Sequence, residues 1–343
     1  MKLLICGSEG RIMSATIPIL QNAGHEVIGL DTCEKWGQRR LHSSIDYRFV
    51  RGSCADPRVL RPLLKGVEGV IQAAATLYGV NGFHRRAADI LSNDLNAQQT
   101  VLRLSVEASV DRVVYMSSSM VYERAEKEPY REEEVEHIEV PQTDYGLSKL
   151  VGERLSLAFH RQYKLPYTIW RPFNVIDPAE EGSDDAGMSH VFADILHRMI
   201  GQQQNPLSVL GDGGQVRSFV NIREVAKALA RFSFDQRTEN QALNLGRDEC
   251  VTMRELASRM YEIACAEGLI KEPKRLEFEP TPVVSTDVKR RIGCFEKAAQ
   301  VLGWRSSISL DSSLRECVTA YRDRNVSRPA EVELPHNEML LVR

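Results

Sequence analysis

Short continuous apolar runs, separated by stretches that are apolar at helical spacing, organise the first half of the chain. The runs lie at residues 2–6, 25–31, 47–52, 69–75, 111–118 and 166–172. Such runs predict strands that are buried on both faces of a parallel sheet. Residues 13–24 and 56–66 lie between them and have helical patterns; Asp56 and Pro57 predict a helix start. This alternation predicts an α/β fold with a doubly wound parallel sheet.

The alternation breaks after residue 176. Residues 177–189 are acidic and loop-like, and a helical stretch follows at 191–200. The pattern of residues 207–232 predicts strand, turn, strand and helix, and residues 251–268 predict an amphipathic helix with a capping box. We expect a first domain at 1–176, to whose sheet 219–247 returns. We expect a smaller α/β lobe from 177–218 and 248–322, and a polar tail at 323–343.

Charge and cysteine usage narrow the class of protein. The net charge is −3, which gives no reason to expect a nucleic-acid partner. No run of 18 apolar residues and no signal-peptide pattern is found, so we expect a cytoplasmic protein without a membrane partner. The seven cysteines are scattered without a C-x-x-C pair. This argues against a disulfide framework and against a metal site.

A glycine turn follows the first expected strand directly. Gly7 and Gly10 have the G-x-x-G spacing at which backbone N–H groups approach a pyrophosphate at a helix N-terminus. The third position of that fingerprint is Met13, which leaves the close packing of helix on strand in doubt. An ordinary tight turn would give the same spacing, so this signal needs support from elsewhere in the chain.

That support comes from Asp31, which ends the second expected strand. A carboxylate 24 residues after Gly7 can accept both ribose hydroxyls of an adenosine. It would also repel a 2′-phosphate, which favours NAD over NADP. Strand, turn, helix, strand and acid occur in order, so we expect a dinucleotide site of the Rossmann type.

Tyr145 and Lys149 form a second constellation. They are four residues apart and share one face of a helix. An ammonium near a tyrosine favours the phenolate, which can remove a proton from a sugar hydroxyl while hydride leaves the same carbon. The alternative for this common spacing is a solvated helix face.

The chain resembles the extended short-chain dehydrogenases/reductases of the NAD-dependent epimerase/dehydratase family, which act on nucleotide sugars. The matching segments are G-x-x-G at 7–10, Asp31, AAA at 73–75, Asn93, SSSMVY at 117–122, Tyr145-x-x-x-Lys149, RPFNV at 171–175, GDGGQVRSFV at 211–220, LNLG at 243–246 and LGW at 302–304. The resemblance implies a tightly held NAD in the first domain, a nucleotide-diphosphate sugar in the smaller lobe, and a homodimer. It implies that Tyr145, Lys149 and Ser118 are the catalytic residues.

The resemblance also implies two sets of binding residues. The expected cofactor-binding residues are Gly7, Gly10, Arg11, Ile12, Asp31, Ser53, Cys54, Ala73, Ala74, Ala75, Asn93, Ser117, Tyr145, Lys149 and Phe173. The expected substrate-binding residues are Gly79, Ser118, Ser119, Tyr145, Asn174, His190, Arg217 and Arg290, with Arg291 as the alternative to Arg290. Arginine suits a diphosphate because its planar fork donates two hydrogen bonds to one phosphate.

Met120 distinguishes among the chemistries of the family. Sugar 4,6-dehydratases and decarboxylating relatives carry a glutamate at this place, and GDP-fucose synthases and GDP-mannose 3,5-epimerases carry a cysteine. A thioether can neither accept nor deliver the proton that those reactions move. Met120 therefore favours chemistry at one carbon only, which is that of a 4-epimerase.

Two alternatives stay open at this point. The loop at 75–83 and His190 resemble their counterparts in 3,5-epimerases and fucose synthases, where the histidine is an acid or base. The chain would then be a 3,5-epimerase or a 4-keto reductase. A non-catalytic NAD-binding sensor is the more remote alternative, because the chain retains Tyr145, Lys149 and Ser118 together.

Overall fold

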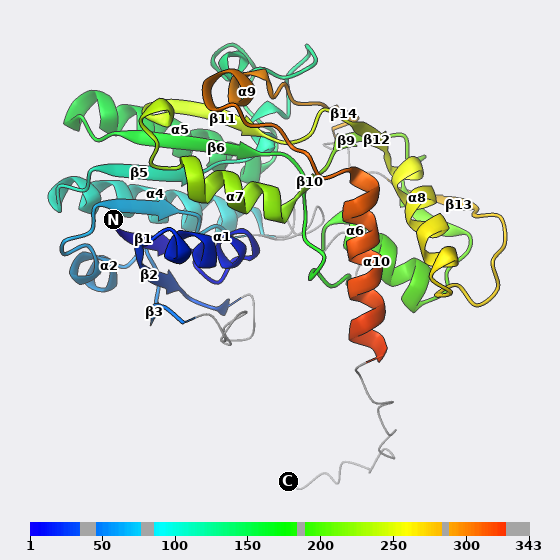
Figure 1. The fold of residues 1–343 in the computed structure, drawn as a ribbon. Helices are drawn as coiled ribbons and strands as arrows, with labels where there is room; N and C mark the ends of the chain where they lie inside the picture. Colours follow the sequence, from blue (N-terminus) through cyan, green and yellow to red (C-terminus); the bar gives the residue numbers. More distant parts are fainter. Residues whose placement is uncertain (35–45, 77–85, 184–188, 283–287, 327–343) are drawn as a thin grey trace, which may run out of the picture.

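The computed structural model describes residues 1–34, 46–76, 86–183, 189–282 and 288–326. A seven-stranded, all-parallel sheet forms the larger part, with the strand order β11-β6-β5-β4-β1-β2-β3 (Figure 1). The strands are β1 (Lys2–Cys6), β2 (Glu26–Asp31), β3 (Arg48–Arg51), β4 (Gly69–Gln72), β5 (Arg112–Met116), β6 (Tyr167–Pro172) and β11 (Gln241–Leu245). The six runs predicted as strands are β1 to β6, and the α/β fold class is confirmed.

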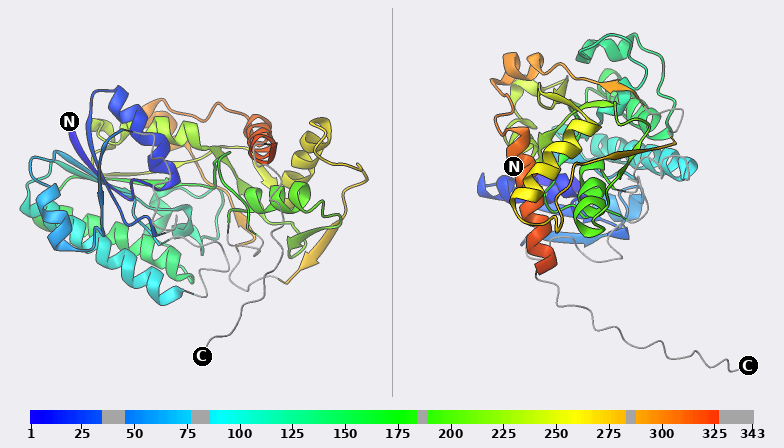
Figure 2. Two further views of the ribbon diagram at one scale, coloured as in Figure 1. Left: turned by 90° about the horizontal axis from the view of Figure 1, so that it is seen from below. Right: turned by 90° about the vertical axis from the view of Figure 1, so that its right-hand side faces the viewer.

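Helices cover both faces of this sheet, as Figure 2 shows. Leu3 and Ile5 of β1 pack with α1 (Arg11–Asn22) and α7 (Ile222–Phe232). Leu4 and Cys6, which point to the opposite face, pack with α2 (Pro57–Leu63) and α4 (Ala87–Glu107). Alternate residues of one strand thus enter two separate cores, which explains its continuous apolar character. Asp56 caps α2 as predicted, accepting a hydrogen bond from the Arg58 N–H.

A second group of elements packs around its own apolar cluster. This cluster draws residues from α6 (Val191–Leu196), α8 (Met253–Ala266) and α10 (Leu310–Val326). Small sheets border it: β12-β9-β14, β13-β8 and β10-β7. Their strands are β7 (Val175–Ile176), β8 (Leu207–Leu210), β9 (Val216–Ser218), β10 (Val220–Asn221), β12 (Cys250–Thr252), β13 (Phe278–Thr281) and β14 (Arg290–Arg291). The predicted capping box of Thr252 and Glu255 is present at α8.

Some element boundaries differ from the prediction. Helix α10 continues to Val326, past the expected start of the polar tail at 323. The helix expected at 191–200 is α6 followed by a π-helical turn at 197–201. No described helix is long and apolar enough to cross a membrane. Among the described residues, no cluster of His, Cys, Asp and Glu side chains could hold a metal ion.

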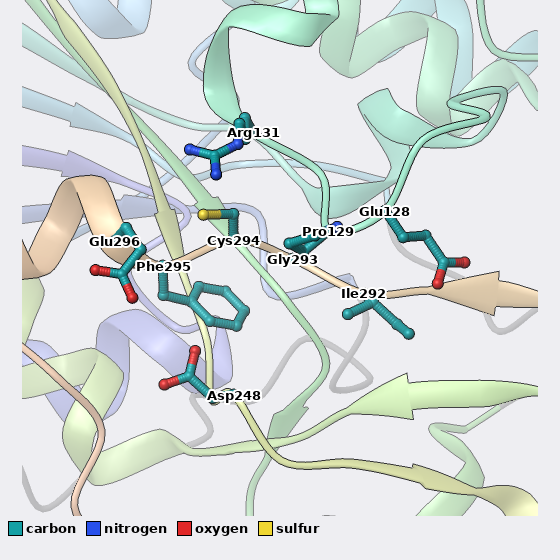
Figure 3. A pocket seen from close by; sticks show the side chains of 9 residues that line it. All are labelled: Glu128, Pro129, Arg131, Asp248, Ile292, Gly293, Cys294, Phe295 and Glu296. Atoms are coloured by element: carbon teal, nitrogen blue, oxygen red, sulfur yellow. The ribbon is translucent and has the colours of Figure 1, made fainter.

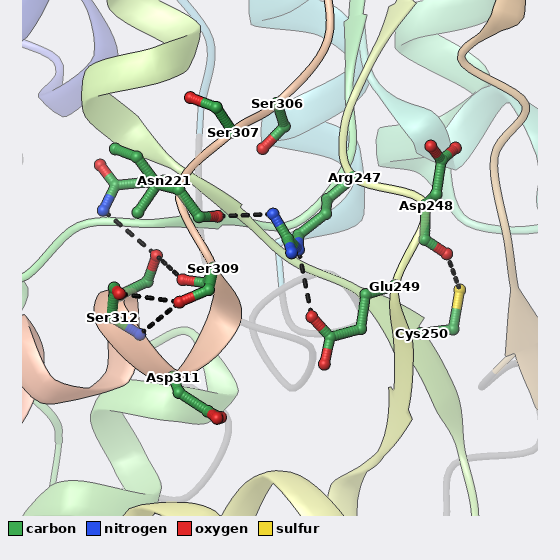
Figure 4. Close-up of polar contacts among 12 residues, drawn as sticks. Asn221, Arg247, Asp248, Glu249, Cys250, Ser306, Ser307, Ser309, Asp311 and Ser312 are labelled. Atoms are coloured by element: carbon green, nitrogen blue, oxygen red, sulfur yellow. Dashed lines mark hydrogen bonds and ion pairs between the residues drawn. The ribbon is translucent and has the colours of Figure 1, made fainter.

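The segment between α9 (Glu296–Leu302) and α10 is fixed by side chains of the larger part. Glu224 of α7 accepts hydrogen bonds from the Ser306 hydroxyl and from the N–H groups of Ser307 and Ile308. Arg247 donates to the Ile308 carbonyl and to Glu249 (Figure 4). These contacts attach the segment before α10 to the larger part of the molecule. They thereby fix the start of α10, which packs in the second cluster.

A buried ion pair joins helix α5 (Asp144–Tyr163) to the central sheet. The Arg171 guanidinium of β6 donates twice to Glu153 of α5, at 2.9 and 2.7 Å. The Ser117 hydroxyl donates to the same carboxylate at 2.5 Å. Both charged side chains are about 95% buried, so removal of one would leave the other charge without compensation.

We therefore expect Glu153→Gln to lower the free energy of unfolding by about 3 kcal/mol, because a buried guanidinium loses its counter-charge. Glu107→Gln is the matched control, since Glu107 pairs with Arg61 in an exposed position. It should cost less than about 1 kcal/mol. Urea denaturation midpoints measure both effects. Equal midpoints for the two variants would contradict the structural role of the buried pair.

Candidate active site

The turn between β1 and α1 lies where the strand order reverses, between β1 and β4. Gly7 has a φ of +80°, and a Cβ added there would lie 2.5 Å from the backbone nitrogen of Ala74. Gly10 is the N-cap of α1, and it provides no side-chain cap. The first turn of α1 therefore presents its N–H groups and the positive end of the helix dipole at this edge. This arrangement suits an anionic group such as a pyrophosphate.

Asp31 lies at the end of the neighbouring strand β2. Its carboxylate accepts hydrogen bonds from the Glu9 N–H at 3.0 Å and from the Cys33 N–H at 2.7 Å. Burial is the main cause that raises the pKa of Asp31, and the nearby Glu9 charge adds to it. Glu9 is itself buried and accepts a hydrogen bond from Tyr47. Two carboxylates therefore make this edge electronegative, which would disfavour a phosphate on a bound ribose.

Several other predicted cofactor-binding residues lie around the turn. Ala73 follows β4 and donates its N–H to the Cys6 carbonyl at 2.9 Å, and the Cys54 thiol is buried beside Gln72. Ala74, Ala75 and Ile12 are half-buried at the same edge, and Ser53 accepts a hydrogen bond from the Ala55 N–H. Arg11 begins α1, and its guanidinium pairs with Asp177 at 2.8 Å.

Other predicted residues lie elsewhere or are engaged otherwise. Asn93 lies on α4 and is exposed. The hydroxyl of Ser117 is bound to Glu153. Phe173 is fully buried in an aromatic cluster, 5.2 Å from Phe295 between ring centroids. Gly79 lies outside the described residues.

The three predicted catalytic residues lie on α5 and at the start of the short helix η2 (Ser119–Tyr122). Tyr145 and Lys149 face one way on α5, with the Lys149 Nζ 5.6 Å from the centre of the Tyr145 ring. Ser118 is the N-cap of η2, and its hydroxyl accepts a hydrogen bond from the Met120 N–H at 3.2 Å. All three are largely buried. The geometry brings a phenol, an ammonium and a hydroxyl to one region.

Helix η2 and the start of α5 are in direct contact. A Cβ added at Gly146 would lie 2.9 Å from the Met120 carbonyl oxygen, so only a glycine allows this approach. Glu123, which follows η2, accepts hydrogen bonds from the Thr143 N–H and hydroxyl at 3.0 and 2.8 Å. Thr143 in turn caps α5. These contacts fix the serine turn relative to Tyr145.

Met120 is in contact with a cation. The Arg291 guanidinium contacts the Met120 sulfur and donates to the Asn174 side-chain oxygen at 2.9 Å. Asn174 also donates to the Ser218 carbonyl at 2.8 Å. Arg217 is the register neighbour of Arg291 on β9, and its guanidinium donates to the carbonyls of Val288 and Lys289. Ser119 of η2 is buried.

Of the two adjacent arginines weighed from the sequence, Arg291 is the one beside Met120. Arg290 is exposed and pairs with Glu128 at 3.0 Å. Successive side chains on a strand point to opposite faces, so β14 can bring only one of the two to the catalytic residues. The structure thus favours Arg291 over Arg290 for that region.

His190 lies at the start of α6 and is held by Glu180. The imidazole Nδ1 lies 2.8 Å from both oxygens of Glu180, which also accepts the His190 N–H at 3.1 Å. Burial opposes ionisation of Glu180, but His190 and Arg11 outweigh it and lower the Glu180 pKa to about 2. The imidazole itself is largely exposed, so it could meet a ligand.

A separate cavity of about 490 Å³ lies beside the segment that follows β14 (Figure 3). Glu128 and Ile292 lie at one side of it and Glu296 at the other. Its other lining residues are Pro129, Arg131, Asp248, Gly293, Cys294 and Phe295. None of the residues predicted to bind cofactor or substrate lines it.

The sequence reasoning missed two buried acids, Asp94 and Glu180. Asp94 follows Asn93 and is buried, with its carboxylate 3.9 Å from the Lys149 Nζ. The helical phase of α4 was the available signal, since Ile90, Ala97 and Val101 are buried on the same face. Glu180 gave no such signal, because it lies in an irregular segment.

The chain is similar to known proteins over nearly its whole length. The model of the NAD dependent epimerase/dehydratase family matches residues 3–246. A putative UDP-glucose 4-epimerase of Methanocaldococcus jannaschii is 27% identical, with 94% of this chain and 99% of that protein covered. GDP-L-fucose synthase 1 of Arabidopsis thaliana is 25% identical, with 93% of each covered. The crystal structure of Thermotoga maritima UDP-glucose 4-epimerase with UDP-glucose superposes with a TM-score of 0.80, at 25% identity, covering 95% of this chain and 100% of that one.

The close approach at Gly7 predicts the result of a paired substitution. Gly7 and Gly24 both have positive φ, but a Cβ at Gly24 would meet nothing within 4 Å. Gly24→Ala should therefore cost about 1 kcal/mol of stability, from backbone strain alone. Gly7→Ala should cost about 3 kcal/mol, because overpacking against Ala74 adds to that strain.

Urea denaturation gives the two stabilities, and calorimetric titration with NAD gives the affinities. We expect Gly7→Ala to abolish NAD binding and Gly24→Ala to leave it unchanged. Wild-type NAD affinity in Gly7→Ala would show that the turn does not form the cofactor site.

Proposed function

The chain belongs to the NAD dependent epimerase/dehydratase family, and we propose that it is a nucleotide-sugar epimerase that inverts C4 of the sugar. The observation that carries the proposal is the grouping of Tyr145, Lys149 and Ser118 around Met120, which cannot transfer a proton. Within this group Tyr145 is the residue that we propose exchanges a proton with the substrate, which suffices for chemistry at a single carbon.

NAD fits the residues of the β1–α1 edge. The positive first turn of α1 suits the pyrophosphate, and Asp31 suits the hydroxyls of the adenosine ribose. Glu9 and Asp31 together would repel a 2′-phosphate, which favours NAD over NADP. When bound, NAD would accept hydride from C4 and later return it.

In this proposal Tyr145 performs the proton transfers. Its phenolate accepts the proton of the C4 hydroxyl, and Lys149 stabilises that phenolate through its positive charge. The Ser118 hydroxyl, positioned by η2, donates a hydrogen bond to the oxygen at C4. After the 4-keto sugar has turned over in the site, Tyr145 returns the proton to the same oxygen.

The surroundings of Met120 argue against proton transfer at other carbons. The acid nearest to Met120 in sequence is Glu123. It accepts hydrogen bonds from Thr143 and thereby fixes the start of α5. The thioether of Met120 and the guanidinium of Arg291 line the place at which a dehydratase needs an acid. Neither group can act as a base near neutral pH.

The nucleoside diphosphate would lie along β9 and β14. We propose Arg217 and Asn174 as its binding residues, with Arg291 in place of Arg290. The 4-epimerase names of the relatives agree with the proposed reaction. The homodimer and the cytoplasmic location stay predictions.

One observation favours a second candidate function. His190 is oriented by Glu180 through a hydrogen bond, as a carboxylate orients the histidine of an acid–base pair. A relative is named a GDP-L-fucose synthase. If His190 reaches the sugar, it could exchange the proton at C3 or C5, and the chain would be a 3,5-epimerase or a 4-keto reductase.

Product analysis in D2O separates these functions. The purified protein, without added cofactor, would be incubated with UDP-, GDP-, ADP-, CDP- and dTDP-sugars, followed by proton NMR and mass spectrometry. We expect a C4 diastereomer of unchanged mass, with no deuterium on carbon. Tyr145→Phe should lower kcat by at least about 100-fold, because the acid–base group is lost.

Tyr163→Phe is the matched control, since Tyr163 is exposed at the other end of α5, and it should leave kcat unchanged. Deuterium at C3 or C5, abolished by His190→Gln, would replace the C4 proposal by the second candidate. Loss of water from the sugar would contradict the interpretation of Met120.

A further inference from the structure

Asp94 is the one buried acid of helix α4. The helix contains three acids, and the other two, Asp89 and Glu107, are exposed. Asp94 is only 6% exposed and lies on the face that packs against α5. Burial of a carboxylate without partners is strongly unfavourable, so the groups around it indicate why it is tolerated there.

Each oxygen of the Asp94 carboxylate has a distinct partner. One oxygen accepts the N–H of Thr76 at 2.8 Å, just after the alanines that follow β4. The other accepts the Ser148 hydroxyl of α5 at 3.2 Å and lies 3.9 Å from the Lys149 Nζ. One buried side chain thus connects the chain after β4, the helix α4 and the catalytic turn of α5.

The ammonium of Lys149 lies between Asp94 and two phenol rings. Its Nζ is 5.4 Å from the centre of the Tyr115 ring and 5.6 Å from that of Tyr145, and it donates to the Met116 carbonyl at 3.2 Å. Glu153, one turn further along α5, is paired with Arg171 instead. Burial and then the charge of Asp94 raise the pKa of Tyr115. Asp94 is thus the acid paired with Lys149 among the groups packed around it.

We propose that Asp94 is a positioning residue for the reaction at Tyr145. Its carboxylate holds the Lys149 ammonium in place beside the Tyr145 ring and ties the Ala73–Thr76 segment to α5. The role rests on the proposed function, since it acts through Lys149 on the proton transfer of Tyr145.

The sign of the charge effect follows from the arrangement. The negative charge of Asp94 attracts the Lys149 ammonium and partly cancels its field at Tyr145. Asp94→Asn removes that negative charge and leaves the ammonium beside the Tyr145 ring. The kcat–pH profile therefore moves to lower pH when Asp94 is neutralised.

Asp94→Asn tests this with little change of shape, because the amide keeps the oxygen that accepts the Thr76 N–H. We expect kcat at neutral pH to fall about 10- to 100-fold, as for misplacement of a catalytic group. We expect KM to be unchanged and the kcat–pH profile to move to lower pH. Asp89→Asn makes the same charge change at an exposed site of α4 and should match wild type in both. An unshifted profile in Asp94→Asn would overturn the proposal.

A second readout needs no sugar substrate. The absorbance of tyrosinate at 295 nm, compared between proteins with and without Tyr145→Phe, isolates Tyr145 among the ten tyrosines. The difference titration should move to lower pH in the Asp94→Asn background, and coincident titrations would contradict the proposed role. A shifted titration together with no sugar turnover in wild type would contradict the proposed function, but it would support the charge effect of Asp94 on Tyr145.

If Asp94→Asn does not fold, as judged by its thermal transition, the kcat of Ser148→Ala tests the positioning role instead. This substitution removes the hydroxyl that contacts both the carboxylate, at 3.2 Å, and the Tyr145 carbonyl, at 2.9 Å, without a change of charge. A kcat below that of wild type is then expected. A wild-type kcat would contradict the positioning role.

Discussion

Three buried carboxylates fix the position of helix α5. The candidate active site is built on that helix. Glu123 binds Thr143 at its start, Asp94 meets Ser148 and Lys149 one turn later, and Glu153 pairs with Arg171 a turn further on. A buried carboxylate without partners is unfavourable, so each one strongly specifies where its partners lie. The position of Tyr145 relative to Ser118 follows from these attachments, because Glu123 directly follows η2, Asp94 lies on α4 and Arg171 lies on β6.

The nucleotide edge is specified differently, by backbone geometry. Gly7 lets the turn after β1 approach Ala74. The first turn of α1, which has no side-chain cap, presents its N–H groups beside this turn. Asp31 is fixed beside it by two backbone donors. The two halves of the site meet at Ala73–Thr76, since this segment touches Gly7 at one end and Asp94 at the other. A displacement of this segment would therefore disturb both the predicted cofactor-binding edge and the predicted catalytic residues.

Much of the fold could be predicted from the sequence because the central strands are buried on both faces. Strands β1 to β6 stand out as apolar runs, and Asp56 and Thr252 mark helix starts through local capping chemistry. The shared helix face of Tyr145 and Lys149 could also be predicted, from their spacing of four residues. Arg290 and Arg291 could not be distinguished, since the choice depends on the register of a two-residue strand.

Other parts of the site depend on contacts between distant segments. The place of Asn93 in a motif predicts it as a cofactor-binding residue, and the helical phase of α4 exposes Asn93 and buries its neighbour Asp94. Ser117 belongs to the serine run, but its hydroxyl is bound by Glu153, 36 residues later. The pairing of Glu180 with His190 crosses an irregular segment without a periodic pattern. Such pairs form through tertiary packing, and local sequence patterns do not predict them.

The central claim is that one carbon of the sugar is oxidised and reduced again within one binding event. A nucleotide sugar deuterated at C4 tests this most directly, with the protein as purified and unlabelled NAD added in excess. The claim predicts a C4-inverted product that retains the deuterium at C4, because the same hydride returns before the sugar leaves. Loss of the deuterium from C4, or inversion at another carbon with C4 unchanged, would contradict it.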